Sequence, residues 1–126
     1  MQAIRIDPDL AKAHNNLGNA YRGSGKIDEV IESYKQALRI APDYSDAQIA
    51  LGYAYAMLGK HEEATEPCKQ AIKIDPDDAE AHFRLGLTYL VLNDISSALD
   101  QYKILKKLDT EKANLLFNLI KHDGRK

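Results

Sequence analysis

Few side chains in this sequence have the types and the spacing that chemistry requires. Cys68 is the single thiol, and the histidines His14, His61, His82 and His122 are scattered along the chain. A nucleophile needs a base and an orienting group beside it, and a metal ion needs several ligands together; neither arrangement occurs at a recognisable spacing. We therefore predict a chain that is not an enzyme and has no catalytic residue, no metal site and no cofactor. Cys68 is predicted to be a small apolar core residue.

The composition describes one folded domain without a charged binding surface. The 126 residues carry a net charge of -2, and 44% of them are hydrophobic and 29% charged. These values exclude a collagen-like or a disordered chain. The basic residues are dispersed, and Lys103, Lys106 and Lys107 alternate with apolar residues as on the solvated face of a helix. We therefore predict no nucleic-acid partner.

The sequence contains no candidate membrane segment. No apolar run approaches the roughly 18 residues of a spanning helix. The N-terminal stretch MQAIRIDPDL lacks the apolar core of a secretion signal. A single cysteine cannot form an internal disulfide, which is compatible with a reducing compartment. These observations predict a cytoplasmic protein with no membrane partner.

A regular internal period organises the whole chain. The pattern Leu-Gly-x-x-Tyr begins at Leu17 and recurs at one constant interval, at Leu51 and at Leu85. The same interval relates further positions: Pro8, Pro42 and Pro76, and Gly25, Gly59 and Asn93. Such a period indicates an array of repeated units. It divides the chain into a first segment, three units and a last segment: 1–10, 11–44, 45–78, 79–112 and 113–126.

Each unit is predicted to be a helix, a tight turn and a second helix. Apolar residues recur at helical spacing on both sides of a breaker. Gly25 and Gly59 suit a positive φ at that turn, and Asn93 is the next best residue there. The glycines inside the first helices cost about 1 kcal/mol each relative to Ala, which indicates close helix contact. Their expected partners are Val30, Ala64 and Ala98 of the second helices.

These units resemble the tetratricopeptide repeat, whose period is about 34 residues. Its pattern combines Leu-Gly-x-x-Tyr in the first helix with a small residue, an aromatic residue, Ala and a final Pro in the second. Unit by unit, it is matched by Leu17, Gly18, Tyr21, Val30, Tyr34, Ala37 and Pro42; by Leu51, Gly52, Tyr55, Ala64, Cys68, Ala71 and Pro76; and by Leu85, Gly86, Tyr89, Ala98 and Tyr102. The sequence departs from the pattern at His14, Gln48 and His82 in the first helices and at Leu105 and Thr110 in the third unit.

The resemblance implies an all-α fold, a right-handed α-solenoid (superhelix) of helix-turn-helix units. Residues 1–10 would be the remnant of the second helix of a preceding repeat in a longer protein. Residues 113–126 would form a C-terminal capping or partial-repeat helix.

The resemblance also implies a non-catalytic protein–protein interaction scaffold. In similar proteins the first helices line a concave groove that receives a peptide or a helix of a partner. Placed by repeat position, the residues expected to contact a protein or peptide partner are Asn15, Asn19, Arg22, Ile49, Tyr53, Phe83, Arg84 and Leu87. The first unit is amide-rich and basic and the third more apolar, which favours a ligand with a polar or acidic part beside the first unit.

Two known subtypes do not fit. Chaperone adaptors that clamp acidic C-termini resemble a pattern of Lys and Asn, then Asn, then Lys and Arg in successive units. Here only Asn19 and Arg84 agree, and Glu80 stands where a Lys is usual and would repel a carboxylate. The Asn ladder of the glycosyltransferase-associated type is also absent from the first helices.

An alternative remains open, a homo-oligomerisation module. The last segment is apolar around much of a predicted helix, whereas a terminal capping helix should have a polar outer face. Assembly would then use the groove or the apolar terminal helix, through Leu116 and Ile120.

Overall fold

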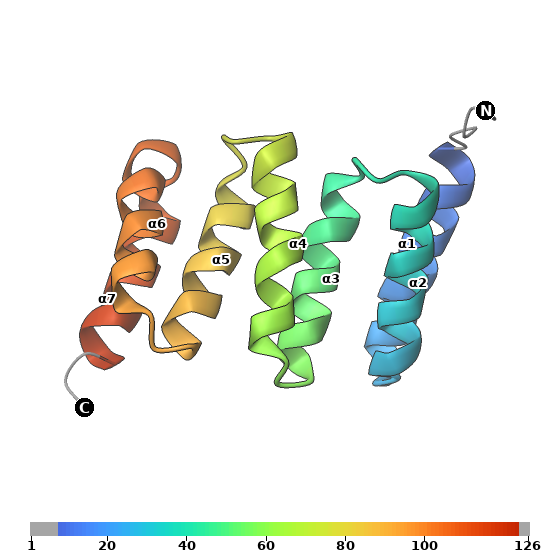
Figure 1. The fold of residues 1–126 in the computed structure, drawn as a ribbon, viewed down its shortest axis with the longest axis horizontal. Helices are drawn as coiled ribbons and strands as arrows, with labels where there is room; N and C mark the ends of the chain where they lie inside the picture. The colour runs from blue at the N-terminus through green and yellow to red at the C-terminus, as the bar shows by residue number, and fades with distance from the viewer. Residues whose placement is uncertain (1–7, 124–126) are drawn as a thin grey trace.

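The computed structural model describes residues 8–123 and contains seven helices there, with no β-strand among those residues (Figure 1). They are α1 (Pro8–Ser24), α2 (Ile27–Ile40), α3 (Ser45–Met57), α4 (His61–Ile74), α5 (Ala79–Val91), α6 (Ile95–Leu108) and α7 (Thr110–Asp123). None of the described helices is long and apolar enough to cross a membrane.

Each helix packs on its neighbours in the sequence. The helices pair as α1 with α2, α3 with α4 and α5 with α6, and the pairs meet through α2 on α3, α4 on α5 and α6 on α7. Figure 1 shows the pairs in a row with α1 and α7 at opposite ends. Contacts between sequence neighbours are the defining feature of a solenoid. The predicted all-α helical-repeat solenoid is therefore confirmed.

The turns inside the pairs have the backbone conformation expected from the sequence. Gly25 and Gly59 have φ values of +79° and +77°, and Asn93 has a φ of 63°. This left-handed region favours Gly, and Asn is among the few other residues that tolerate it. The three breakers thus end the first helix of each pair as predicted.

The glycines inside the first helices do mark close packing, and large side chains lie nearest to two of the three. A Cβ on Gly18 would lie 2.6 Å from Cε1 of Tyr34, and one on Gly86 would lie 2.6 Å from Cδ2 of Leu116. At Gly52 a predicted partner is among the nearest atoms, since the carbonyl oxygen of Ala64 lies 3.2 Å from the Cβ position. Large side chains of a facing helix, rather than small ones, fill the space beside Gly18 and Gly86.

The N-terminal end of the array exposes an apolar position that is buried further along. Leu51 and Leu85 are 6% and 3% exposed, whereas the equivalent Leu17 is 44% exposed. Leu51 and Leu85 follow a preceding helix pair, and no described helix precedes α1. The segment 1–10 was predicted as the end of a preceding helix. Its residues 1–7 lie outside the described part of the chain, and Pro8 begins α1. Proline is well suited to the first turn of a helix, where its missing N–H has no partner to lose.

The last helix, α7, packs against α5 and α6. Ala113, Leu116 and Ile120 of α7 are buried in one cluster with Ala98 and Leu105 of α6. Leu116 is 0% and Ile120 6% exposed. The prediction that these two side chains contact a second copy was therefore wrong, because α5 and α6 already cover them. α7 begins at Thr110, so its first turn lies within the predicted third unit.

Candidate functional site

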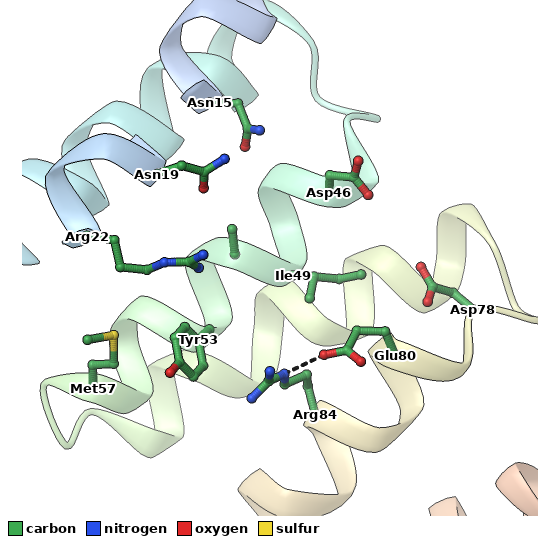
Figure 2. Close-up of a pocket in the computed structure, with 11 residues that line it drawn as sticks. Asn15, Asn19, Arg22, Asp46, Ile49, Tyr53, Met57, Asp78, Glu80 and Arg84 are labelled. Carbon is green, nitrogen blue, oxygen red and sulfur yellow. Dashed lines mark hydrogen bonds and ion pairs between the residues drawn. The ribbon is translucent and has the colours of Figure 1, made fainter. Parts of the chain in front are cut away.

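A hollow of about 730 Å³ opens between the first helices α1, α3 and α5 (Figure 2). Of the predicted contact residues it is lined by Asn15, Asn19, Arg22, Ile49, Tyr53 and Arg84. The other side chains that line it are Asp46, Ala50, Met57, Asp78 and Glu80. Met57 and Asp78 were not identified from the sequence, although Met57 stands one helical turn after Tyr53.

Helical spacing explains why these side chains share the hollow. Asn15, Asn19 and Arg22 follow one another at intervals of four and three residues, and so lie on one face of α1. Ile49 and Tyr53 are four residues apart on α3. Because the three first helices stand side by side, their faces combine into one surface.

Tyr53 lies under two guanidinium groups from different units. Cζ of Arg84 is 4.6 Å and Cζ of Arg22 is 5.4 Å from the centroid of the Tyr53 ring. Both distances are within the range of cation–π attraction, worth about 0.5–1 kcal/mol at partly exposed sites. Figure 2 shows the side chains of Arg22 and Arg84 extending towards Tyr53 from different helices.

The two guanidinium groups differ in their charge partners. Nε of Arg84 lies 2.7 Å from Oε2 of Glu80, and the other oxygen of Glu80 lies 3.7 Å from Nζ of Lys112. Among residues 8–123, no carboxylate is within ion-pair distance of Arg22. The charge of Arg84 is thus neutralised within the chain, and that of Arg22 is available to a ligand.

Asn19 is held by a hydrogen bond that sequence reasoning missed. The hydroxyl of Tyr34 on α2 donates to Oδ1 of Asn19. Burial raises the pKa of Tyr34, against a smaller opposing effect of Arg22, so the phenol stays a donor at neutral pH. Because Oδ1 is occupied, the NH₂ group of Asn19 is the part left to bind a ligand acceptor.

Asn15 is a second polar group on the same face. Its side chain is 8% exposed, and its Oδ1 has no hydrogen-bond partner in the described part of the chain. The face of α1 presents amides and one free cation.

The carboxylates gather at the other end of the hollow. Asp46 stands in the first turn of α3, and Asp78 precedes α5, where its Oδ1 accepts a hydrogen bond from the backbone N–H of Ala81 at 3.2 Å. In Figure 2 these two side chains lie at the opposite end of the hollow from Arg22. The site is polarised, with the free positive charge at one end and negative charge at the other.

Phe83 and Leu87 do not line the hollow. Both are half-buried and pack against the cluster formed by α6 and α7. Leu87 instead lines a separate small cavity between α3, α4 and α5. The fold of α7 against α5 explains the difference, since it covers the part of α5 that was expected to face a partner.

The single thiol of the chain lies in the core. Cys68 is 1% exposed, and burial raises the pKa of its thiol to about 11, so the thiol is protonated at neutral pH. This confirms the prediction that Cys68 is a core residue. Within residues 8–123 no group of three or more His, Cys, Asp or Glu side chains could hold a metal ion.

Known proteins share this fold. Among solved structures, the first TPR of Spaghetti (RPAP3) bound to the HSP90 peptide SRMEEVD has a TM-score of 0.87 and 24% identity, covering 95% of this chain and 98% of that one. The TPR2B domain of yeast Sti1 in a pHsp70 complex has a TM-score of 0.84 and 21% identity, covering 92% and 97%. The Sgt2 TPR domain from Aspergillus fumigatus has a TM-score of 0.83 and 25% identity, covering 99% and 83%.

Family models match most of the sequence, whereas no curated protein matches it. A model described as Tetratricopeptide repeat matches residues 11–44, a second of that description matches residues 33–66, and one described as TPR repeat matches residues 58–93. The first match coincides with the first unit of the internal period. The matches overlap and together extend from residue 11 to residue 93, so the chain belongs to the tetratricopeptide repeat family.

Proposed function

We propose that this chain is a non-catalytic interaction module that holds an extended peptide of a partner protein in the hollow, with an acidic group of the peptide at Arg22. The observation that carries the proposal is the free guanidinium of Arg22 beside the unused NH₂ group of Asn19. Both are donors, and a carboxylate accepts from guanidinium and amide groups together.

The structural relatives support the class of ligand. Two TPR domains of Spaghetti are bound to the HSP90 peptide SRMEEVD, and the second TPR domain of human RPAP3 is in complex with the HSP70 peptide SGPTIEEVD. These peptides carry several carboxylates. In this chain the carboxylates of Asp46, Asp78 and Glu80 would repel such groups at the far end of the hollow. The proposed ligand therefore presents its acidic end to Arg22 and a neutral or basic portion, such as the Ser-Arg end of SRMEEVD, to Asp46 and Asp78.

Replacement of Arg22 by alanine tests the proposal. A hydrogen bond to a charged group contributes about 1.5–3 kcal/mol. We therefore expect Arg22→Ala to weaken binding of a fluorescent SRMEEVD peptide about tenfold in an anisotropy titration. Arg39→Ala is the matched control, because Arg39 is exposed and bonds only Gln36 on the same helix. Equal affinities of wild type and Arg22→Ala, or no binding by the wild type, would contradict the proposal.

Glu80 should oppose acidic ligands, so its removal should have the opposite effect. Glu80→Gln frees the guanidinium of Arg84 and removes one negative charge from the hollow. We expect the same peptide to bind about threefold more tightly to this variant, an increase of the size of one partly screened charge interaction. Glu66→Gln is the control, since Glu66 is also exposed and bonds Gln70 four residues away on α4. A weaker affinity of Glu80→Gln would show that Glu80 attracts the ligand.

A further inference from the structure

A second, smaller cavity lies beside the hollow. It has a volume of about 110 Å³ and is bounded by α3, α4 and α5. Tyr53 and Arg84 line both this cavity and the hollow, so the two spaces are adjacent. Val91, which also lines the cavity, is 59% exposed, so the cavity is open to the surface.

The repeat explains why this space exists. Cys68 occupies the position in the second unit that Tyr34 occupies in the first and Tyr102 in the third. In the first unit the ring of Tyr34 fills the space against Gly18. In the second unit Gly52 faces the sulfur of Cys68, 3.0 Å from the Cβ position, and both residues line the cavity. A thiol where the neighbouring units have a phenol leaves the volume of a ring unfilled.

The walls of the cavity select an uncharged occupant. Ala56, Leu87 and Val91 provide apolar surface, and Cys68 provides a thiol that burial keeps protonated. The polar lining residues are Tyr53, His61, Arg84 and Thr88. The charge of Arg84 is already paired with Glu80, and Nδ1 of His61 is buried without a hydrogen-bond partner in the described chain. An apolar cavity of about 150 Å³ accommodates a benzene molecule, so the smaller space suits an aliphatic side chain.

We infer that the cavity beside Cys68 is a specificity pocket that takes one aliphatic side chain of the peptide held in the hollow. This inference rests on the proposed function, because a side chain in the cavity must belong to a backbone that passes Tyr53 and Arg84. The free charge of Arg22 and this pocket together define the ligand as an extended segment with an aliphatic residue near an acidic one. Filling an existing apolar space gains contacts without first opening it.

The test restores the side chain that the other units carry. Cys68→Tyr should fill the cavity, as Tyr34 fills the equivalent space, and should weaken binding of the SRMEEVD peptide about tenfold. SRAEEVD and SRMEEAD, in which Met or Val becomes Ala, identify the side chain involved. One of these two peptides should bind wild type about tenfold more weakly than SRMEEVD does. Its affinity for Cys68→Tyr should be no lower than its affinity for wild type. Leu115→Tyr, which adds the same ring at an exposed position outside both spaces, is the control and should keep the affinity for SRMEEVD. If Cys68→Tyr binds the peptide as tightly as wild type, the inference is overturned and the proposed function still stands. The proposed function fails if Arg22→Ala has no effect on binding.

A second measurement does not depend on a peptide or on the tyrosine variant. Xenon is a small apolar probe, and NMR spectra under xenon pressure should show shifts of the Leu87 and Val91 methyl signals in wild type. Cys68→Leu, a smaller filling residue, should abolish most of those shifts, and the exposed Leu115 should not respond in either protein. Absence of a response in the wild type would show that the cavity does not admit an apolar group and would overturn the inference.

Discussion

Replacing Leu116 by alanine is expected to lower the free energy of unfolding by about 2–5 kcal/mol, the range for a fully buried leucine. Leu116 is 0% exposed, and its two δ-methyl groups lie against Gly86 of α5. The cluster that it joins closes the C-terminal end of the array, where no further described repeat adds contacts. Urea unfolding followed by circular dichroism measures the change.

Leu115 provides a control on the same helix. It is 55% exposed, and Leu115→Ala should change the free energy of unfolding by no more than about 0.5 kcal/mol. Sedimentation of the wild type at high concentration completes the comparison. A dimer that Leu115→Ala dissociates and Leu116→Ala leaves intact would show that α7 contacts a second copy through its outer face. Equal unfolding curves for the two variants would contradict the burial of Leu116.

Replacing Tyr34 by alanine should be comparably costly, at about 3–5 kcal/mol. Tyr34 is the largest fully buried side chain of the described residues, its ring fills the space beside Gly18, and its hydroxyl holds Asn19. Tyr34→Phe keeps the ring and loses only the hydrogen bond, so it should cost about 1 kcal/mol. Thermal and urea unfolding of the two variants separate the ring from the hydroxyl.

Gly18 and Tyr34 should be strongly coupled. A Cβ at Gly18 would clash with the Tyr34 ring, which is enclosed and cannot move aside, so Gly18→Ala alone should destabilise by about 1–3 kcal/mol. In the Tyr34→Ala protein the same change should instead stabilise by up to about 1 kcal/mol, because alanine favours the helix and the space is empty. Additive effects in this double-mutant cycle would contradict the packing of the ring on Gly18.

The fold was predictable because its signals are local and repeated. A turn that needs a positive φ selects Gly25, Gly59 and Asn93 whatever the distant parts of the chain do. The partners of the internal glycines were not predictable in the same way. Leu116 contacts Gly86 from α7, a helix outside the repeat pattern. The spacing of residues in the sequence does not predict how α7 packs on α5.

The candidate site was predictable to the extent that it follows helix faces. The resemblance placed Asn15, Asn19 and Arg22 on one face of the first helix by repeat position, and all three line one hollow in the structure. Phe83 packs against the cluster of α6 and α7, and repeat position alone does not show that α7 covers part of α5. The hydrogen bond from Tyr34 to Asn19 joins α2 to α1. It depends on how the two helices pack, and residue spacing in the sequence does not give that packing.

The shared ring of Tyr53 connects ligand binding to the mechanics of the array. Arg22 belongs to the first unit and Arg84 to the third, yet both stack on this one ring in the second. A tension that straightens the solenoid would draw both cations away from the ring and pull the proposed peptide-binding surface apart. A bound peptide would resist that extension, so this module should unfold at a higher force in a single-molecule pulling experiment when its hollow is occupied.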